Sequence, residues 1–313
     1  MSVKQFIKST PVPICGLSLG LASLDRFFSE HYSDMYHFGI CALFAFVIVL
    51  LFTFRIIIDG KGIKKDLENP AVFAVLPTYT MTLMLLSAHA AQYIGIIAQG
   101  IWISAIIASF VMMFFFIKRF ILRFRIENVF PSWVIIFVGY VVASVTSPAF
   151  GMEWLGKLLF WSGFIGYLSI LPIAAYRVLF VKGIPESLVP QAAIFAAPVN
   201  LCIVGCLTIY ENAPPEIVLS LLVILSITSY AAVMLYLPIM LNRRFYPSYA
   251  ALTFPLVISA VSFHMLGEHY GLSGDLFNVL QMTVAAIAVI IVVYVLIRYS
   301  VFMYRNAMRV AVN

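Results

Sequence analysis

Five prolines recur along the chain at nearly equal intervals, and this period constrains the fold more than any single motif does. The prolines are separated by 57 to 61 residues and lie at Pro13, Pro70, Pro131, Pro190 and Pro247. After seven or eight positions, each is followed by a second residue that weakens a helix: Gly20, Pro77, Gly139, Pro198 and Pro255. A fixed period indicates one structural unit copied along the chain. We therefore expect five copies of one unit, each with a breakable point near its start.

The composition places these units in a lipid bilayer. Hydrophobic residues make up 63% of the chain and charged residues 10%, whereas a soluble domain carries about 25% charged residues. About ten segments have the roughly 20 mostly apolar residues that cross a bilayer, and they must be helices because backbone groups in lipid have to bond internally. The predicted spans are 13–28, 36–57, 70–91, 93–117, 131–147, 152–180, 189–209, 215–240, 247–267 and 275–303.

The predicted fold is an all-α membrane protein with ten transmembrane helices, paired as five helical hairpins with quasi-five-fold symmetry. Residues 1–313 form a single integral membrane domain, whose repeats start near 13, 70, 131, 190 and 247. Odd-numbered spans are rich in small and hydroxyl residues, whereas even-numbered spans carry bulky runs such as 111–116. Because small residues permit close helix packing and large apolar ones suit lipid, we expect an inner ring of odd-numbered helices around a pore. The alternative is that the small residues only mark tight packing in a closed bundle.

The periodic residues have a predicted role within the inner helices. A proline removes a backbone donor and clashes with the preceding turn, which lipid tolerates where protein covers the freed backbone or a polar cavity adjoins it. Pro77, Pro198 and Pro255 are expected to kink their helices near mid-membrane, and Gly20 and Gly139 to give softer bends.

The basic residues predict the orientation of the spans. Of the 19 Lys and Arg residues, all but Arg26 and Lys157 fall on connections at one side of the ten spans. The positive-inside rule assigns the richer side to the cytoplasm, which places both termini there. The net charge of +6 then reflects topology and attraction to anionic membrane lipid, and no nucleic-acid partner is expected.

The residues that coupled transport or catalysis would need are missing from the centres of the predicted spans. No Asp, Glu, Lys or Arg lies clearly in the middle third of a span, and coupled transporters keep such groups there, so passive conduction is favoured. His89 and His264 could take up protons, although an interfacial or packing role is expected for each. The four cysteines lie inside spans without a metal-ligand pattern. The sequence thus predicts no enzyme, no metal and no cofactor, and it leaves the sign of the permeant ion open.

Local motifs within this periodic frame carry a resemblance to a known family. They are PICGLSLGLA at 13–22, LPT at 76–78, APVN at 197–200 and FPLVISAVSF at 254–263. Together with the period they resemble the TehA family of tellurite-resistance and dicarboxylate transport proteins, bacterial TehA homologues above all. The same family includes the slow-type anion channel of plant guard cells and fungal malate permeases. The resemblance implies a homotrimer in the bacterial inner (plasma) membrane, with one pore per protomer for small inorganic anions such as chloride and nitrate.

The resemblance also implies site residues. A phenylalanine on the ninth helix closes the pore in that family, and Phe263 is the matching position here, eight residues past Pro255. Gly16 matches a position where a side chain would crowd the first helix against the pore. The runner-up function is a carrier of dicarboxylates or oxyanions such as malate or tellurite, with proton linkage as one form of it. A non-conducting membrane assembly is the third alternative.

Overall fold

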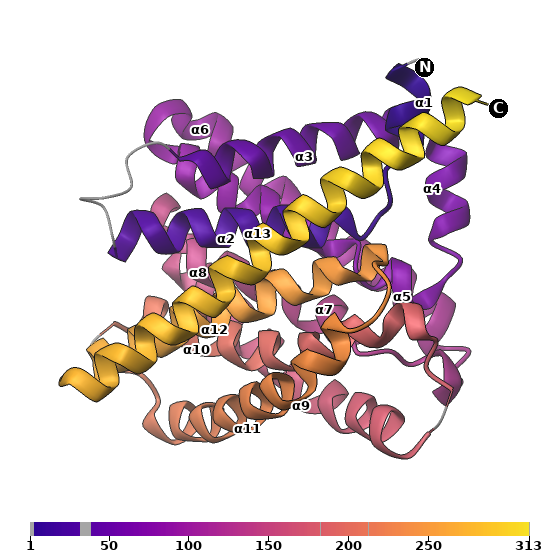
Figure 1. Cartoon of the computed structure of the whole chain (residues 1–313). Coiled ribbons are helices and arrows are strands. Elements are labelled where there is room, and N and C mark those ends of the chain that lie inside the picture. The colour runs from indigo at the N-terminus through magenta and orange to yellow at the C-terminus, as the bar shows by residue number, and fades with distance from the viewer. Residues whose placement is uncertain (1–2, 32–38, 182, 212, 313) are drawn as a thin grey trace.

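The computed structural model describes residues 3–31, 39–181, 183–211 and 213–312, and within these ranges the chain forms helices and turns without a strand. Residues 36–38, at the start of the predicted second span, and Lys182 lie outside the described residues. The α-helices, drawn in Figure 1, are α1 (Val3–Lys8), α2 (Ile14–His31), α3 (Ile40–Ile58), α4 (Gly60–Asp66), α5 (Pro70–Phe73), α6 (Pro77–Phe116), α7 (Trp133–Val138), α8 (Val142–Thr146), α9 (Glu153–Phe180), α10 (Ala197–Tyr210), α11 (Glu216–Leu241), α12 (Thr253–His269) and α13 (Asp275–Val312). Short 3₁₀ helices lie at Ile126–Asn128, Gly139–Val141, Ser147–Phe150, Glu186–Ala196 and Pro247–Leu252, and a π-helical turn at Ile117–Ile121.

Eight helical segments among the described residues are long and apolar enough to cross a membrane. They are Ile40–Ile58, Pro70–Ile121, Trp133–Phe150, Glu153–Phe180, Glu186–Tyr210, Glu216–Leu241, Pro247–His269 and Asp275–Asn306. The second of these covers 52 residues, more than twice the roughly 20 that one crossing needs. Its backbone is non-helical at Gly95, with φ 42° and ψ −112°, a conformation that glycine adopts readily. α2 is not among the eight, and its 18 residues include the charged Asp25, Arg26 and Glu30.

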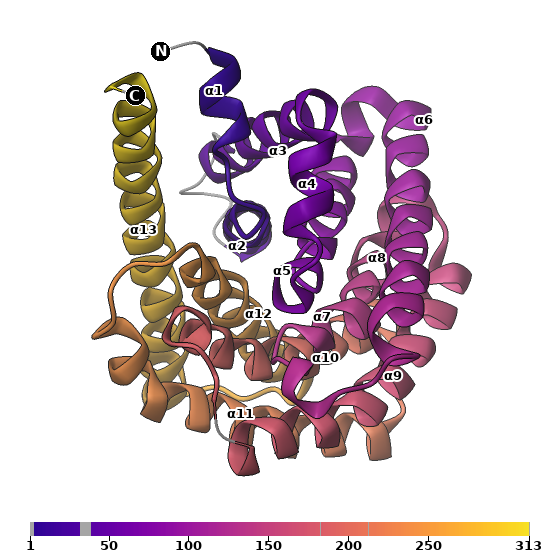
Figure 2. The same cartoon turned by 90° about the vertical axis from the view of Figure 1, so that its right-hand side faces the viewer.

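Three segments that carry the repeated Pro or Gly residues are more deeply buried than the segments between them, whereas the buried share of the long Pro70–Ile121 is 28%. In the most apolar stretch of each, the buried share of residues is 72% for Trp133–Phe150, 83% for Glu186–Tyr210 and 72% for Pro247–His269. The corresponding shares are 28% for Ile40–Ile58, 39% for Glu153–Phe180, 17% for Glu216–Leu241 and 22% for Asp275–Asn306. α2 is buried continuously from Ile14 to Asp25. Figure 2 looks along α2 and shows α3, α9, α11 and α13 toward the outside, with α10 and α12 nearer the middle.

The periodic prolines lie where the backbone changes from tight turns to α-helix. Pro77 is the first residue of α6, Pro198 the second of α10 and Pro255 the third of α12. Gly139 begins the 3₁₀ helix between α7 and α8. The sequence predicts kinks inside continuous helices, whereas the structure starts an α-helix at each proline. The physical reason is that the first turn of a helix has no intrahelical acceptor for its N–H groups, so a proline is tolerated there.

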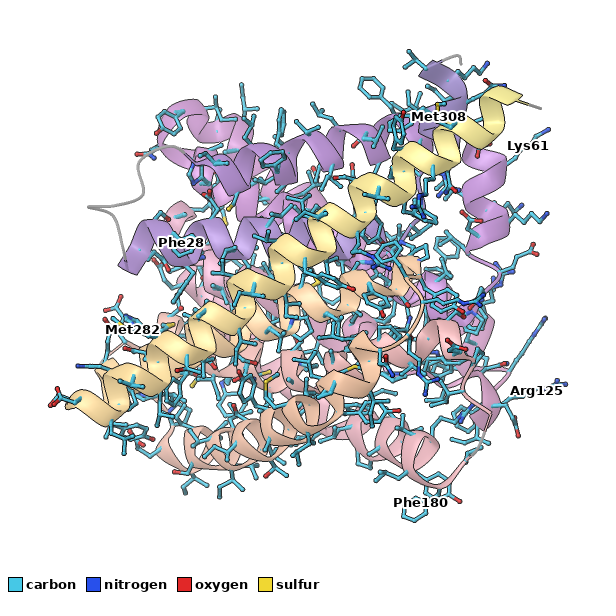
Figure 3. All side chains as sticks on the ribbon, in the orientation of Figure 1. Phe28, Lys61, Arg125, Phe180, Met282 and Met308 are labelled. Carbon is cyan, nitrogen blue, oxygen red and sulfur yellow. The ribbon has the colours of Figure 1, made fainter. Side chains whose placement is uncertain are left out.

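Both ends of the described chain lie at one end of the molecule. α1 packs against α3 and α13, and Figure 1 shows α1 beside the C-terminal part of α13. Figure 3 places Lys61 and Arg125 at this same end. The buried Arg55 of α3 secures it, because its guanidinium donates to the Thr10 carbonyl and pairs with Asp66. The termini and these basic side chains therefore share one end of the helical body.

Candidate functional site

All five segments with periodic residues line one space, which we call the proline cavity. Water-sized molecules can occupy about 50 Å³ of it. Each segment contributes residues at close helical spacing: Pro13, Gly16 and Leu19; Val75, Thr78 and Met81; Ile135, Val138 and Gly139; Ile194, Ala197 and Leu201; Ala250, Ala251 and Phe254. Residues three or four apart share one face of a helix, so each segment turns one face to this cavity. The lining is largely apolar.

A second and smaller space, the arginine cavity, with about 20 Å³ open to water-sized molecules, follows along the same five segments. Its lining includes Ser23, Arg26 and Glu30 of α2; Leu85 of α6; Val142 and Val145 of α8; Leu201 and Val204 of α10; Phe254, Ile258 and Val261 of α12. In every segment the residue numbers rise from the proline cavity to the arginine cavity. The five segments therefore run parallel to one another, and the two cavities succeed each other along a common axis.

Leu201 and Phe254 line both cavities and form the boundary between them. Phe254 is 7% exposed and lies in the first turn of α12, directly before Pro255. The preceding residue fixes this turn, because the Thr253 hydroxyl lies 3.0 Å from the Gly16 carbonyl oxygen and donates toward it. The start of α12 is thus tied to α2 at the level of the boundary, and the Phe254 side chain is held between the two cavities.

Most of the predicted pore residues lie at the proline cavity. Its lining includes Gly16, Gly139, Pro198 and Pro255. Pro77 is not among its lining residues, but the adjacent Thr78 is. The period therefore locates the segments that surround the axis, although it does not by itself say which side chains face it.

Gly20 has a different role from the one that the sequence suggests. A Cβ atom at this position would lie 2.5 Å from Thr253 Oγ1 and 3.1 Å from the Phe254 backbone nitrogen. These distances are too short for any side chain, so Gly20 permits close contact between α2 and α12. Gly16 is less tightly placed, because its Cβ would meet the Ala250 Cβ at 3.3 Å.

Phe263 does not lie at the axis. Its ring packs against Phe277 of α13, with the ring centres 5.1 Å apart, and it is not a lining residue of either cavity. At 3.6 residues per turn, Phe263 is about 80° from Pro255 but almost opposite the face of Phe254, Ile258 and Val261. Pro255 lies at the edge of the lining face, and this is why counting from it misleads. The gate role of Phe263 stays a prediction from the resemblance, and the geometry does not support it.

A polar vestibule, with about 190 Å³ open to water-sized molecules, adjoins the arginine cavity between α2, α3, α6 and α8. Its charged lining residues are Asp25, Arg26 and Glu30 of α2 and His89 of α6. Arg26 Nε donates to Glu30 Oε1 at 2.7 Å. Asp25 accepts the Ala42 backbone N–H at 2.9 Å, and its other oxygen lies 3.7 Å from His89 Nδ1. Among the described residues, no group of three or more His, Cys, Asp or Glu side chains is placed to hold a metal ion.

Sequence reasoning assigned Arg26 to a connection and overlooked Glu30. A usable signal was present, because Gly16, Leu19, Ser23, Arg26 and Glu30 follow one another at steps of three and four. That spacing places the two charged residues on the same face of α2 as the predicted pore residue Gly16.

A buried polar network fixes three helices beside the cavities. The Asn200 amide of α10 donates to the Ala196 carbonyl at 2.6 Å and to Ser259 Oγ of α12 at 2.9 Å. Its carbonyl oxygen accepts hydrogen bonds from Ser226 of α11, at 2.7 Å, and from Ser262 of α12. Asn200 therefore connects two lining helices with one peripheral helix.

Comparison with known protein families identifies the family to which the chain belongs. The family model SLAC1, described as voltage-dependent anion channel, matches residues 14–299. The chain belongs to the SLAC1 family. This membership confirms the resemblance to the TehA family and makes the chain a multi-pass membrane protein of an anion-channel family. The matched range of this SLAC1-family protein contains all five segments that line the axis, and a search of curated proteins finds no match to it.

Proposed function

We propose that the protein conducts small inorganic anions such as chloride and nitrate passively along the axis of the five parallel segments. The observation that carries the proposal is that two successive cavities are each lined by all five of these segments. A succession of spaces between parallel helices suits a conduction path, whereas a mere packing defect would be local. The boundary at Leu201 and Phe254 makes the path closed in this conformation.

The helix starts favour an anion over a cation. α2, α6, α10 and α12 begin at Ile14, Pro77, Ala197 and Thr253, beside lining residues of the proline cavity. The first N–H groups of α2 and α6 bond to carbonyls of the preceding turns, as Gly16 does to Pro13 and Thr78 to Val75, so the contribution that remains is the positive end of each helix dipole, which stabilises an anion. Four such starts around an apolar space give a positive potential without a charged side chain, which suits weak binding and fast passage.

The remaining architecture belongs to the same proposal. We infer that Gly95 divides Pro70–Ile121 into two crossings and that α2 is a further crossing, which gives ten spans in five hairpins with quasi-five-fold symmetry. The end with Lys61 and Arg125 then faces the cytoplasm by the positive-inside rule, together with both termini. The protein is expected in the bacterial inner membrane as a homotrimer. The apolar faces of its peripheral helices would then lie against lipid or a second protomer.

Replacing Phe254 tests the channel function. Phe254→Ala removes the larger side chain at the boundary, and we expect chloride current in planar bilayers to rise about tenfold or more, a barrier lowered by at least about 1.4 kcal/mol. Phe263→Ala is the matched control, since it deletes the same side chain from the same helix away from the axis. Its current should equal that of the parent.

The opposite result would identify Phe263 as the gate. If Phe263→Ala opens the path and Phe254→Ala does not, the gate implied by the resemblance is correct and the cavity boundary is not the closed point. If neither variant carries current although both insert and fold, the protein is a non-conducting assembly.

One observation favours the runner-up, a carrier of dicarboxylates or oxyanions linked to protons. The buried Asp25 and the His89 imidazole lie side by side in the polar vestibule, and such pairs serve proton-coupled transporters. A carrier predicts saturable malate or tellurite exchange that follows a proton gradient. A channel predicts current that follows the electrochemical gradient of the anion and ignores that of the proton.

A further inference from the structure

Arg26 lies where the polar vestibule joins the axis. Its side chain lines both the vestibule and the arginine cavity. Nε donates to Glu30 one turn further along α2, and Nη1 donates to the Val145 carbonyl oxygen of α8 at 3.0 Å. These two bonds hold the guanidinium across the space between two lining helices. A guanidinium has five N–H donors, so donors remain for a third partner.

We propose that Arg26 is the residue that docks the permeant anion at the vestibule entrance, and that Glu30 competes with this anion for the guanidinium. The inference rests on the proposed channel function and assigns the selection of charge to this pair. Across the linings of the three cavities, as far as the structure describes them, Arg26 is the only Lys or Arg. An anion that moves from the vestibule toward Phe254 passes it.

The geometry allows the exchange of partners. The side chains of Arg26 and Glu30 are 29% and 43% exposed, and an ion pair with that access to water is weak. A weakly hydrated guanidinium with a fork of donors suits a small anion. When the anion replaces Glu30, the Val145 carbonyl still holds Arg26 at the entrance. The bound anion is therefore presented to the arginine cavity without movement of a helix.

The other charged groups at the vestibule determine its balance of positive and negative charge. Asp25 is bonded to the start of α3 through the Ala42 N–H and lies beside His89. α3 and the α8 side contribute apolar or hydroxyl lining residues, such as Thr146, and no charge among the described lining. The vestibule lining thus holds two carboxylates and one guanidinium, of which Glu30 is paired with Arg26, and the removal of the Glu30 charge should favour anion entry.

The test uses the Phe254→Ala protein, whose path is open, in planar bilayers with unequal potassium chloride on the two sides. The reversal potential gives the chloride-to-potassium permeability ratio. In this background, Arg26→Gln should lower the ratio about fivefold and Glu30→Gln should raise the conductance at low chloride by about as much, the effect of one charge near 4 Å in water. Arg26→Lys, which keeps the charge, should retain most of the selectivity.

Lys157→Gln is the matched control. Lys157 is a basic residue that the topology places on the same side as Arg26, but it lies over the Tyr210 ring at 5.2 Å and lines none of the three cavities. Its removal should leave the permeability ratio unchanged. If Arg26→Gln misfolds, Glu30→Gln still decides, since unchanged conductance there overturns the inference.

A failure of the role proposed for Arg26 can be distinguished from a failure of the channel function. Phe254→Ala channels that conduct with the same selectivity in both charge variants overturn the role of Arg26 and leave the channel function intact. Absence of current in both the Phe254→Ala and the Phe263→Ala protein refutes the channel function, and the inference with it. An equal change in Lys157→Gln would assign the effect to surface charge and also overturn the role of Arg26.

Discussion

The passage differs on the two sides of Phe254, although the same five segments line both. The proline cavity has apolar walls and four helix starts beside it. On the other side, the arginine cavity and the vestibule hold a guanidinium and two carboxylates. In the proposed channel, one side would act on an ion through backbone dipoles and shape, and the other through side-chain charge. The difference suggests that selection of charge and closure of the path are separate tasks of separate residues.

The largest effect is expected when the apolar side is made charged. Gly16→Asp places a carboxylate at the proline cavity lining, where an anion would meet a like charge in a membrane interior. We expect anion current to fall about 100-fold, because two like charges about 6 Å apart repel by roughly 3 kcal/mol at an effective dielectric constant near 20. Gly16→Ala, which only crowds Ala250 at 3.3 Å, is the control in bilayer recordings. Parent-like current in Gly16→Asp would show that ions do not cross this cavity.

The next change separates the two helices at the boundary itself. Gly20→Leu puts a side chain where even a Cβ would meet the Phe254 backbone nitrogen at 3.1 Å, so α12 must move away from α2. The expected loss is about 3 kcal/mol of folding stability, measured as detergent-solubilised thermal unfolding. Gly100→Ala is the matched control on α6, because nothing lies within 4 Å of the added atom. Equal stability of the two variants would contradict the close contact.

A smaller loss is expected from the network that supports both sides. Asn200→Leu removes the partner of Ser226, Ser259 and Ser262. Hydrogen bonds between membrane helices contribute about 0.6 to 2 kcal/mol, and we expect a loss of that size in thermal unfolding. Ser104→Ala is the control, because this exposed hydroxyl bonds only to the Gly100 carbonyl of its own helix. No difference between the variants would mean that the network does not join the helices.

The smallest effect is expected from Gln191, a buried side-chain amide at the proline cavity. Gln191 is 2% exposed, lines the proline cavity, and its Oε1 has no partner among the described residues. Gln191→Leu removes a group that can bond to a hydrated ion, and conductance should fall about threefold, the effect of one modest hydrogen bond. Val138→Leu, an apolar change in the same lining, is its control. A rise in current in Gln191→Leu would indicate that the amide obstructs the path.

The sequence was sufficient for the segments that surround the axis and insufficient for the residues that act on it. The proline period located all five lining segments, because helix-weakening residues must lie where backbone is covered by protein. It predicted kinks rather than helix starts, since a sequence alone does not show that 3₁₀ turns precede Pro198 and Pro255.

The two residues that we propose for the site, Phe254 and Arg26, were not selected from the sequence, for different reasons. Phe254 was missed because a count of eight residues from Pro255 selects Phe263, which packs on the far side of α12 against Phe277. Arg26 was missed because a charge near the end of a span reads as part of a connection. The predicted span 13–28 already contained Arg26, and α2, which continues to His31, places this charge within a lining helix.

The hydrogen bond between Thr253 and Gly16 joins residues 237 positions apart. During synthesis, α2 enters the membrane long before α12 has been made. The face of α2 that carries Gly16 and Gly20 therefore has no contact with α12 at that stage. The ring of five segments around the axis is therefore completed late in biogenesis, after most of the chain has been inserted. A chain truncated before α12 would leave that face open to lipid, and quality control could recognise it there.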